Sequence, residues 1–225
     1  MPSLPMPTAV VCDMDGLLFD TEALHLEAVQ AAAQSLGREM PVALFHRMVG
    51  QPWPANHALL LTNWGTASQV EALRERWHHG FVALAATRLV LKPGAADLLT
   101  SLDELGIPYG IATSSGHDDV RANLTAHSLL GRFRTVVAFG DYAKGKPAPD
   151  PYRLAAERLG VEAGRCWALE DSYNGVRSAS AAGMVTIMVP DLLPPTDEVR
   201  ALCAAVLPDL YAVRNALMSS QREHS

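Results

Sequence analysis

Two aspartates stand two positions apart near the start of the chain, in Asp13-Met14-Asp15-Gly16. The preceding residues 9–12 are apolar and rich in valine, which predicts a short strand. In extended backbone, residues i and i+2 point to the same side, so the two carboxylates would lie together and repel each other. Such a pair needs a cation or a shared proton. It suits a catalytic site, but it also suits a turn or a solvated loop end.

A second acidic pair, Glu170-Asp171, follows another short apolar segment. Viewed alone, it would simply cap the helix predicted after it. Placed beside the first pair, it completes an oxygen-rich set that suits Mg²⁺, which typically uses one or two carboxylates with phosphate and water. The sequence therefore predicts Mg²⁺ as a cofactor, with four candidate ligands: Asp13, Asp15, Glu170 and Asp171.

Hydroxyl groups and a lysine add the chemistry of phosphate binding. Thr113, Ser114 and Ser115 precede Gly116 at a predicted turn from strand to helix, where hydroxyls and backbone amides can surround phosphate oxygens. Lys146 lies in a proline-stiffened loop and can place positive charge against a phosphoryl group in transfer. The alternatives are an ordinary helix start and an ordinary surface lysine.

The elements that must position these residues alternate between helix and strand after residue 92. This alternation is typical of crossover connections and of a parallel sheet, and predicts a doubly wound α/β fold. In such sheets ligands bind beyond the carboxyl ends of the strands, where all of these residues fall. The predicted strands are 9–12, 109–113, 135–139, 166–169 and 185–189. The predicted helices are 95–105, 118–126, 150–159, 174–182, 197–206 and 209–218, with a frayed tail from Ser219.

Residues 20–91, in contrast, read as helices joined by loops, without a predicted strand. Two prolines around Trp53 predict a loop over residues 51–54, and Ser68 with Glu71 has the form of a capping box that opens a long helix. This places a helical segment directly after the first strand. We therefore expect an α/β core of residues 1–19 and 92–225 with an inserted helical domain, residues 20–91.

Composition excludes several classes of function. The 225 residues are 49% apolar and carry a net charge of -6 without any basic run, which argues against nucleic acid or an anionic membrane as partner. The three cysteines are far apart and suit a reducing cytoplasm, and we expect neither a signal peptide nor a membrane span. The expectation is a cytoplasmic protein, a monomer or small homo-oligomer, that acts on a small molecule.

Taken in order, these motifs resemble the haloacid dehalogenase superfamily, in its phosphatase and β-phosphoglucomutase-like branch with a helical cap. The resemblance covers nearly the whole chain. It rests on Asp13-Met14-Asp15-Gly16 with Asp20-Thr21-Glu22, on Thr113, on Lys146-Pro147-Ala148-Pro149-Asp150, and on Glu170-Asp171-Ser172 with Asn174-Gly175.

The resemblance implies a Mg²⁺-dependent phosphatase with an aspartyl-phosphate intermediate, acting on a sugar phosphate or a phosphoglycolate-like metabolite. Asp13 is implied as the nucleophile and Asp15 as the proton carrier, with its main-chain carbonyl on the metal. Asp171 is implied as a further metal ligand, with Glu170 acting nearby or through water. The residues implied to hold the phosphoryl group are Gly16, Thr113, Ser114 and Lys146.

The cap is implied to select the substrate, through His25, Gln51 and Trp53. His25 matches a histidine of the family's sugar phosphomutases, although a polar hinge residue is an equal interpretation. Trp53 stands near the place where β-phosphoglucomutases carry an arginine, which weakens the alternative of a phosphomutase. A dehalogenase is disfavoured because relatives with that chemistry lack the second aspartate. From another class, a catalytically silent binding protein on the same fold remains an alternative.

Overall fold

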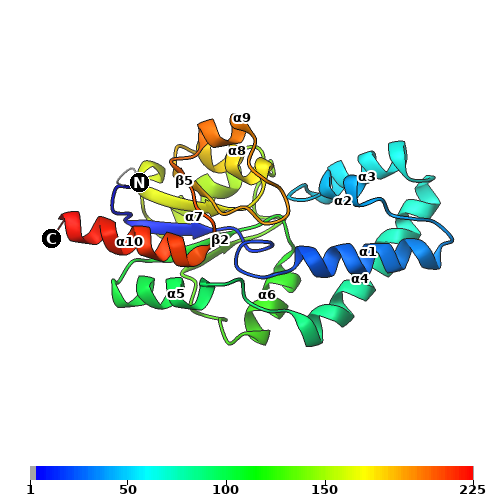
Figure 1. Ribbon diagram of the computed structural model, residues 1–225, viewed down its shortest axis with the longest axis horizontal. Coiled ribbons are helices and arrows are strands. Elements are labelled where there is room, and N and C mark those ends of the chain that lie inside the picture. The colour runs from blue at the N-terminus through cyan, green and yellow to red at the C-terminus, as the bar shows by residue number, and fades with distance from the viewer. Residues whose placement is uncertain (1–3, 225) are drawn as a thin grey trace.

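The structure, a computed structural model, describes residues 4–224, with side chains for residues 4–222, and contains a six-stranded sheet (Figure 1). The strand order is β3-β2-β1-β4-β5-β6, and every neighbouring pair is parallel. The chain thus builds outward from β1 in one direction and then from β4 in the other, as predicted for a doubly wound sheet. The strands are β1 (Ala9–Cys12), β2 (Tyr109–Ala112), β3 (Thr135–Val137), β4 (Cys166–Glu170), β5 (Val185–Met188) and β6 (Ala205–Val206).

Helices of the α/β part cover both faces of this sheet. They are α5 (Ala95–Glu104), α6 (His117–Ala126), α7 (Asp150–Leu159), α8 (Tyr173–Ala181), α9 (Asp197–Leu202) and α10 (Leu210–His224), with a 3₁₀ turn, η1 (Ala163–Arg165), before β4.

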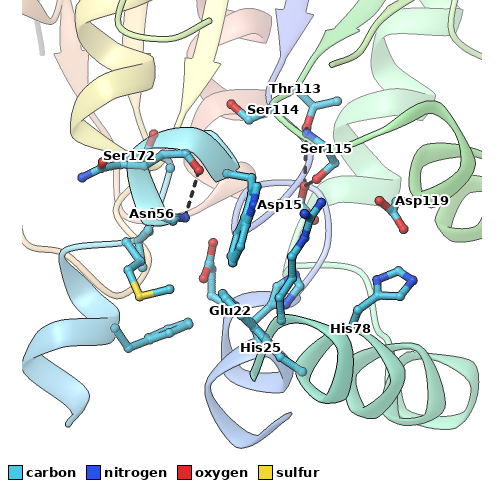
Figure 2. Close-up of a pocket in the computed structure, with 18 of the residues that line it drawn as sticks. Asp15, Glu22, His25, Asn56, His78, Thr113, Ser114, Ser115, Asp119 and Ser172 are labelled. Atoms are coloured by element: carbon cyan, nitrogen blue, oxygen red, sulfur yellow. Dashed lines mark hydrogen bonds between the residues drawn. The ribbon is translucent and has the colours of Figure 1, made fainter. Parts of the chain in front are cut away.

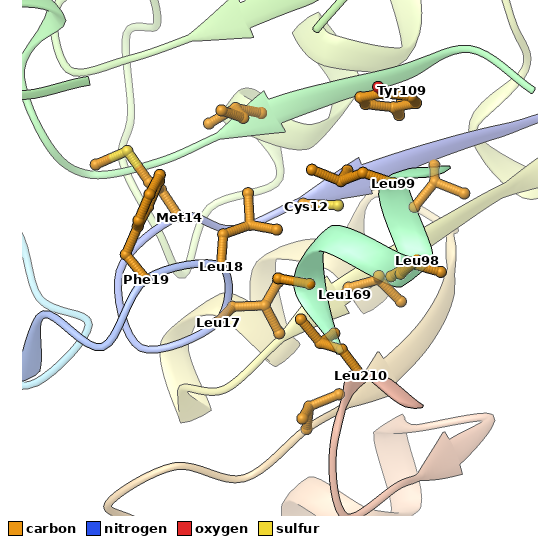
Figure 3. Close-up of a cluster of buried hydrophobic side chains, with 14 of the residues drawn as sticks. Cys12, Met14, Leu17, Leu18, Phe19, Leu98, Leu99, Tyr109, Leu169 and Leu210 are labelled. Atoms are coloured by element: carbon orange, nitrogen blue, oxygen red, sulfur yellow. The ribbon is translucent and has the colours of Figure 1, made fainter. Parts of the chain in front are cut away.

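Successive side chains of the central strand β1 point to opposite faces of the sheet and contribute to two different hydrophobic cores. Val10 and Cys12 face the larger core, which includes leucines of α5 and α10 (Figure 3), whereas Ala9 and Val11 face a core formed with α7. Most of the buried residues in this second core are alanine or valine. Since every residue of β1 is buried, the residues that follow it start from a rigid position.

The segment between β1 and α5 forms a helical body of its own beside the sheet (Figure 1). Its long helices α1 (Glu22–Ser35) and α4 (Ala67–Arg88) pack along one apolar seam. Ala28 and Phe81 lie toward one end of the seam, and Val29 and Leu73 lie toward the other. The four helices are α1 (Glu22–Ser35), α2 (Val42–His46), α3 (Trp53–Asn63) and α4 (Ala67–Arg88).

The two connections to this helical body run side by side. Asp20 N donates to Val90 O at 3.0 Å, Lys92 N donates to Leu18 O at 2.9 Å, and Phe19 pairs with Leu91 in an antiparallel bridge. The chain therefore enters and leaves the helical body through a short antiparallel pair of segments.

Local predictions that differ from the structure have identifiable causes. The predicted loop 51–54 is wrong at its end: α3 begins at Trp53, since Pro54 falls in the first turn where a proline costs no hydrogen bond. The capping box uses Thr66 and Gln69 instead of Ser68 and Glu71, so α4 begins earlier.

The C-terminal predictions also need correction. The predicted helix 197–206 ends at Leu202, and β6 follows as a two-residue edge strand beside β5. Fraying from Ser219 is wrong within the described residues, because α10 continues to His224 and the Ser220 hydroxyl donates to Leu4 O at 2.7 Å. No helix in residues 4–224 is long and apolar enough to span a membrane.

Candidate active site

The loop after β1 fixes the first acidic pair. Asp13 N donates to Leu169 O of β4 at 2.9 Å, which ties this aspartate to the neighbouring strand. Gly16 then adopts a φ of +76° and donates its N–H to the Thr21 hydroxyl at 3.1 Å. Met14, Leu17 and Leu18 are buried in the core below (Figure 3), so the loop is anchored from beneath while Asp13 and Asp15 reach the same cavity.

Lys146 is buried between two carboxylates. Only 3% of the residue is exposed, and its ammonium donates to Asp13 Oδ1 at 2.6 Å and to Glu170 Oε1 at 2.5 Å. Burial alone would lower the pKa of Lys146, but the two carboxylates outweigh it and hold the pKa above its ordinary value. The lysine is therefore a permanent cation beside Asp13, not an ordinary surface lysine.

Glu170 is held by protein groups on both oxygens. Oε1 also accepts the hydroxyl of Tyr152 at 2.7 Å, and Oε2 accepts from the N–H and hydroxyl of Ser172 at 3.3 and 3.1 Å. The Lys146 ammonium lies 5.1 Å from the centroid of the Tyr152 ring. Glu170 thus serves as the anchor of Lys146 in this geometry, and Tyr152 in turn orients Glu170.

Asp15 faces the hydroxyls at the end of β2. Its Oδ2 accepts the Ser115 hydroxyl at 2.6 Å and, more weakly, the Thr113 hydroxyl at 3.4 Å. Burial raises the pKa of Asp15, although these hydrogen bonds oppose the change. A raised pKa favours the protonated carboxyl, which is the form that can give a proton to a leaving oxygen.

Three carboxylates form the group that can hold a metal. Ligand atoms of Asp13, Glu170 and Asp171 all lie within 4.8 Å of one another. Burial raises the pKa of Asp13 to about 7 against the opposing charge of Lys146, and burial together with the charges of Asp13 and Glu170 raises the pKa of Asp171 well above its ordinary value. Among the described residues, nothing donates a hydrogen bond to the buried Oδ1 of Asp171. An unpartnered carboxylate oxygen at the centre of like charges fits a hard divalent cation such as Mg²⁺.

The site opens into a cavity of about 810 Å³ between the sheet and the helical body. Figure 2 shows Thr113, Ser114 and Ser115 on one side and Glu22 and His25 of α1 on the other. Predicted site residues in its lining are Asp13, Asp15, His25, Gln51, Trp53, Thr113, Ser114, Lys146 and Asp171. Gly16 and Glu170 are not among the described residues of the lining, and both are buried.

The ring of His25 contacts two aromatic side chains of α4. It stacks on Phe81 with the centroids 3.7 Å apart and meets the edge of Trp77 at 5.7 Å. Burial lowers the pKa of His25 to about 4, so the ring is neutral at physiological pH. Within the described residues its Nδ1 atom is buried without a hydrogen-bond partner.

Sequence reasoning did not single out Glu22, Tyr152 or Arg74 as site residues. Glu22 is buried at the start of α1, where burial and the charge of Asp15 raise its pKa to about 8. Glu22 belongs to the motif Asp20-Thr21-Glu22 noted in the sequence, whereas Tyr152 and Arg74 reach the site through packing of segments that are distant in the sequence. No local pattern marks such residues.

A model of one protein family, described as haloacid dehalogenase-like hydrolase, matches residues 7–183. The chain is 37% identical over 223 residues to the plasmid-encoded protein CbbY of Cupriavidus necator, with 90% of this chain and 85% of that protein covered. It is 35% identical over 191 residues to a probable pseudouridine-5'-phosphatase of Drosophila melanogaster, with 82% of each covered.

Among solved structures, CbbY of Rhodobacter sphaeroides in a mutant complex with xylulose-1,5-bisphosphate superimposes with a TM-score of 0.80 at 28% identity. The match covers 91% of this chain and 95% of that one.

Proposed function

Since this chain belongs to the haloacid dehalogenase-like hydrolases and, like its phosphatase relatives, is a phosphoric monoester hydrolase, we propose that it uses Asp13 as a nucleophile on a small phosphorylated sugar. The observation that carries the proposal is Lys146, buried with its ammonium 2.6 Å from Asp13 Oδ1 at the end of the cavity. Because the lysine favours the carboxylate form of Asp13, it keeps an anionic nucleophile in a site whose burial opposes charge.

The first step is the attack of an Asp13 oxygen on phosphorus. The bond between phosphorus and the sugar oxygen breaks, Asp15 gives its proton to that oxygen, and an aspartyl-phosphate remains. In the second step Asp15 takes a proton from a water molecule that attacks the same phosphorus, which releases inorganic phosphate and restores Asp13. Lys146, Thr113 and Ser114 hold the phosphoryl oxygens throughout. Gly16, which the sequence also suggested for this role, keeps its N–H bonded within its own loop.

Mg²⁺ is the cofactor that these residues fit. Its side-chain ligands would be Asp13 and Asp171, with the main-chain carbonyl of Asp15, and Glu170 would contribute through its hold on Lys146 or through water. When bound, the cation supplies charge that offsets the phosphoryl oxygens and the crowded carboxylates. The unpartnered Oδ1 of Asp171 supports this assignment.

Residues 20–91 act, in this proposal, as a cap that closes over the cavity and selects the substrate. His25, Gln51 and Trp53 line the cavity from the helical body and are the candidate contacts. The names of the relatives, a pseudouridine phosphatase and a CbbY complex with a sugar bisphosphate, support a phosphorylated sugar as the substrate class. A closed cap also keeps bulk water from the leaving sugar during the first step.

The test is phosphate release from a panel of sugar phosphates, nucleotides and phosphoglycolate, with Mg²⁺ and with chelator. We expect turnover with Mg²⁺ on at least one sugar phosphate, and its loss in Asp13→Asn. Asp141→Asn serves as a matched control, because Asp141 lies outside the cavity and pairs with Arg158 at 2.9 Å. Near wild-type turnover by pure Asp13→Asn protein would refute the assignment.

A further inference from the structure

Asp191 follows β5, at the same edge of the sheet as Asp13 and Asp171, and belongs to none of the motifs noted in the sequence. One of its carboxylate oxygens is held, because Oδ1 accepts from the Lys92 ammonium at 2.7 Å. The other, Oδ2, is buried and has no hydrogen-bond partner among the described side chains and backbone. A buried carboxylate oxygen is costly to leave without a donor, so Oδ2 marks a place where a further donor belongs.

The surroundings of Gly16 show where Asp191 Oδ2 lies. A Cβ added at Gly16 would be 3.3 Å from Asp191 Oδ2 and 2.4 Å from Asp171 Oδ2, so both oxygens border the same side of this glycine. Asp171 is a proposed ligand of the divalent cation, and the carbonyl of Asp15, another proposed ligand, belongs to the peptide bond that enters Gly16. Asp191 is not one of the three carboxylates whose ligand atoms lie within 4.8 Å of one another. It therefore faces the metal site from just outside it.

Lys92 holds Asp191 from the connection between the helical body and the α/β part. Its backbone N–H donates to Leu18 O at 2.9 Å, which fixes the position of the lysine in that connection. Its ammonium lies 2.7 Å from Asp191 Oδ1 but 3.6 Å from Asp20 Oδ1, and the side chain of Asp191 is 12% exposed against 42% for Asp20. Asp191 is thus the main partner of Lys92. Because the ammonium occupies Oδ1, Oδ2 is the oxygen left for the metal site.

We propose that Asp191 is a positioning residue of the metal site, whose Oδ2 accepts a hydrogen bond from a water molecule in the hydration shell of the cation while Lys92 holds Oδ1. Mg²⁺ keeps several water molecules when it binds to proteins, and acceptors around a metal site orient its ligands and raise its affinity. Asp191 acts through that water and touches neither the phosphate nor the sugar. The inference rests on the metal site of the proposed function and adds to it a residue that links the cation to a connection of the helical body.

The experiment measures the dissociation constant of Mg²⁺ by calorimetric titration of the whole protein without substrate. Asp191→Asn keeps the size of the side chain but offers one oxygen, and if Lys92 retains that oxygen, an NH₂ group faces the water. Loss of such an outer contact weakens metal binding by about 10- to 100-fold, and we expect a loss in this range. Asp20→Asn is the matched control: it removes a carboxylate that also contacts Lys92 but is more exposed, and it should leave the constant nearly unchanged.

Lys92→Met separates positioning from a simple effect of charge. Removal of a nearby positive charge would by itself strengthen Mg²⁺ binding, whereas loss of the group that fixes Asp191 weakens it. We expect weaker binding, and Lys92→Arg should restore most of the affinity. Thermal melts in chelator identify a variant that does not fold, in which case the substitutions at the other position decide the test.

Unchanged Mg²⁺ affinity in Asp191→Asn, an equal loss in Asp20→Asn, or tighter binding by Lys92→Met would overturn the proposal, and the proposed phosphatase function would stand. Absence of Mg²⁺ binding by the wild-type protein would refute the metal site of the proposed function, and this inference with it.

Discussion

Tyr152→Phe tests whether the buried network behind Asp13 positions Lys146. The substitution removes one hydroxyl, which donates to Glu170 Oε1 at 2.7 Å, and leaves the packing of a fully buried ring in place. A hydrogen bond to a charged group contributes about 1.5–3 kcal/mol. For a chain of this size, about 2–4 °C of Tm corresponds to each kcal/mol, so we expect Tm to fall by roughly 3–12 °C.

The catalytic effect should appear in kcat. Without the Tyr152 hydroxyl, Glu170 is free to turn, and Lys146 then loses its fixed position beside Asp13. A misplacement that costs about 1.4 kcal/mol in the transition state lowers kcat about tenfold. Because the cap contacts are untouched, KM should change little.

Tyr109→Phe is the matched control for this experiment. The Tyr109 hydroxyl also donates to a carboxylate, Asp103 Oδ1, at 2.8 Å, but Asp103 is half exposed and keeps Arg132 at 2.5 Å. The Tyr109→Phe substitution should therefore lower the free energy of unfolding by about 1 kcal/mol or less and leave kcat unchanged. Thermal melts and initial rates of the two variants decide the matter. A normal kcat in Tyr152→Phe, or an equal loss in both variants, would refute the reasoning.

Three further predictions concern Gly16 in the loop after β1, the divalent cation and the buried His25. Gly16→Ala should lower Tm and raise several-fold the Mg²⁺ concentration needed for half-maximal activity, because the added Cβ would lie 2.4 Å from Asp171 Oδ2. Gly106→Ala is the control: Gly106 has a similar positive φ of 66° but no atom within 4 Å of the added Cβ, so this variant should lower Tm only. Removal of divalent cations with chelator should lower the Tm of the wild-type protein, because Asp13 and Asp171 repel each other, and added Mg²⁺ should restore it; a Tm insensitive to Mg²⁺ would contradict the metal site. The pKa of His25 is lowered from 6.5 to about 4, so the unfolded chain binds the proton first and the folded state loses up to about 3 kcal/mol as pH falls from 6.5 toward 4. Chemical denaturation across that range should give a shallower loss for His25→Gln, and parallel curves for both proteins would count against a buried neutral ring.

Sequence patterns predicted the parts of this molecule that depend on local order. The sheet and the convergence of Asp13, Thr113 and Asp171 follow from apolar strands that all end at one edge. The edge strand β6 was missed because two residues, Ala205 and Val206, carry no periodicity and gain their strand form only from pairing with β5.

The contacts of individual side chains were less predictable. Thr21 stands at the cap position of α1, yet its hydroxyl accepts from Gly16 instead of capping the helix. Ser115, beside the predicted Thr113, makes the shorter bond to Asp15. Such choices depend on tenths of an ångström set by packing, which residue types and spacing do not encode.

The antiparallel pairing at Asp20 and Lys92 has a consequence for how this chain can be changed. Because the ends of the helical body meet, the α/β part needs only a short turn from Phe19 to Leu91 to close its own chain. Exchange of the whole helical segment for another, or its replacement by a tight turn, therefore adds little loop-closure entropy to the rest of the fold. If the helical body selects the substrate as proposed, the chemistry of the strand ends and the choice of substrate can be engineered, or evolve, as separate modules.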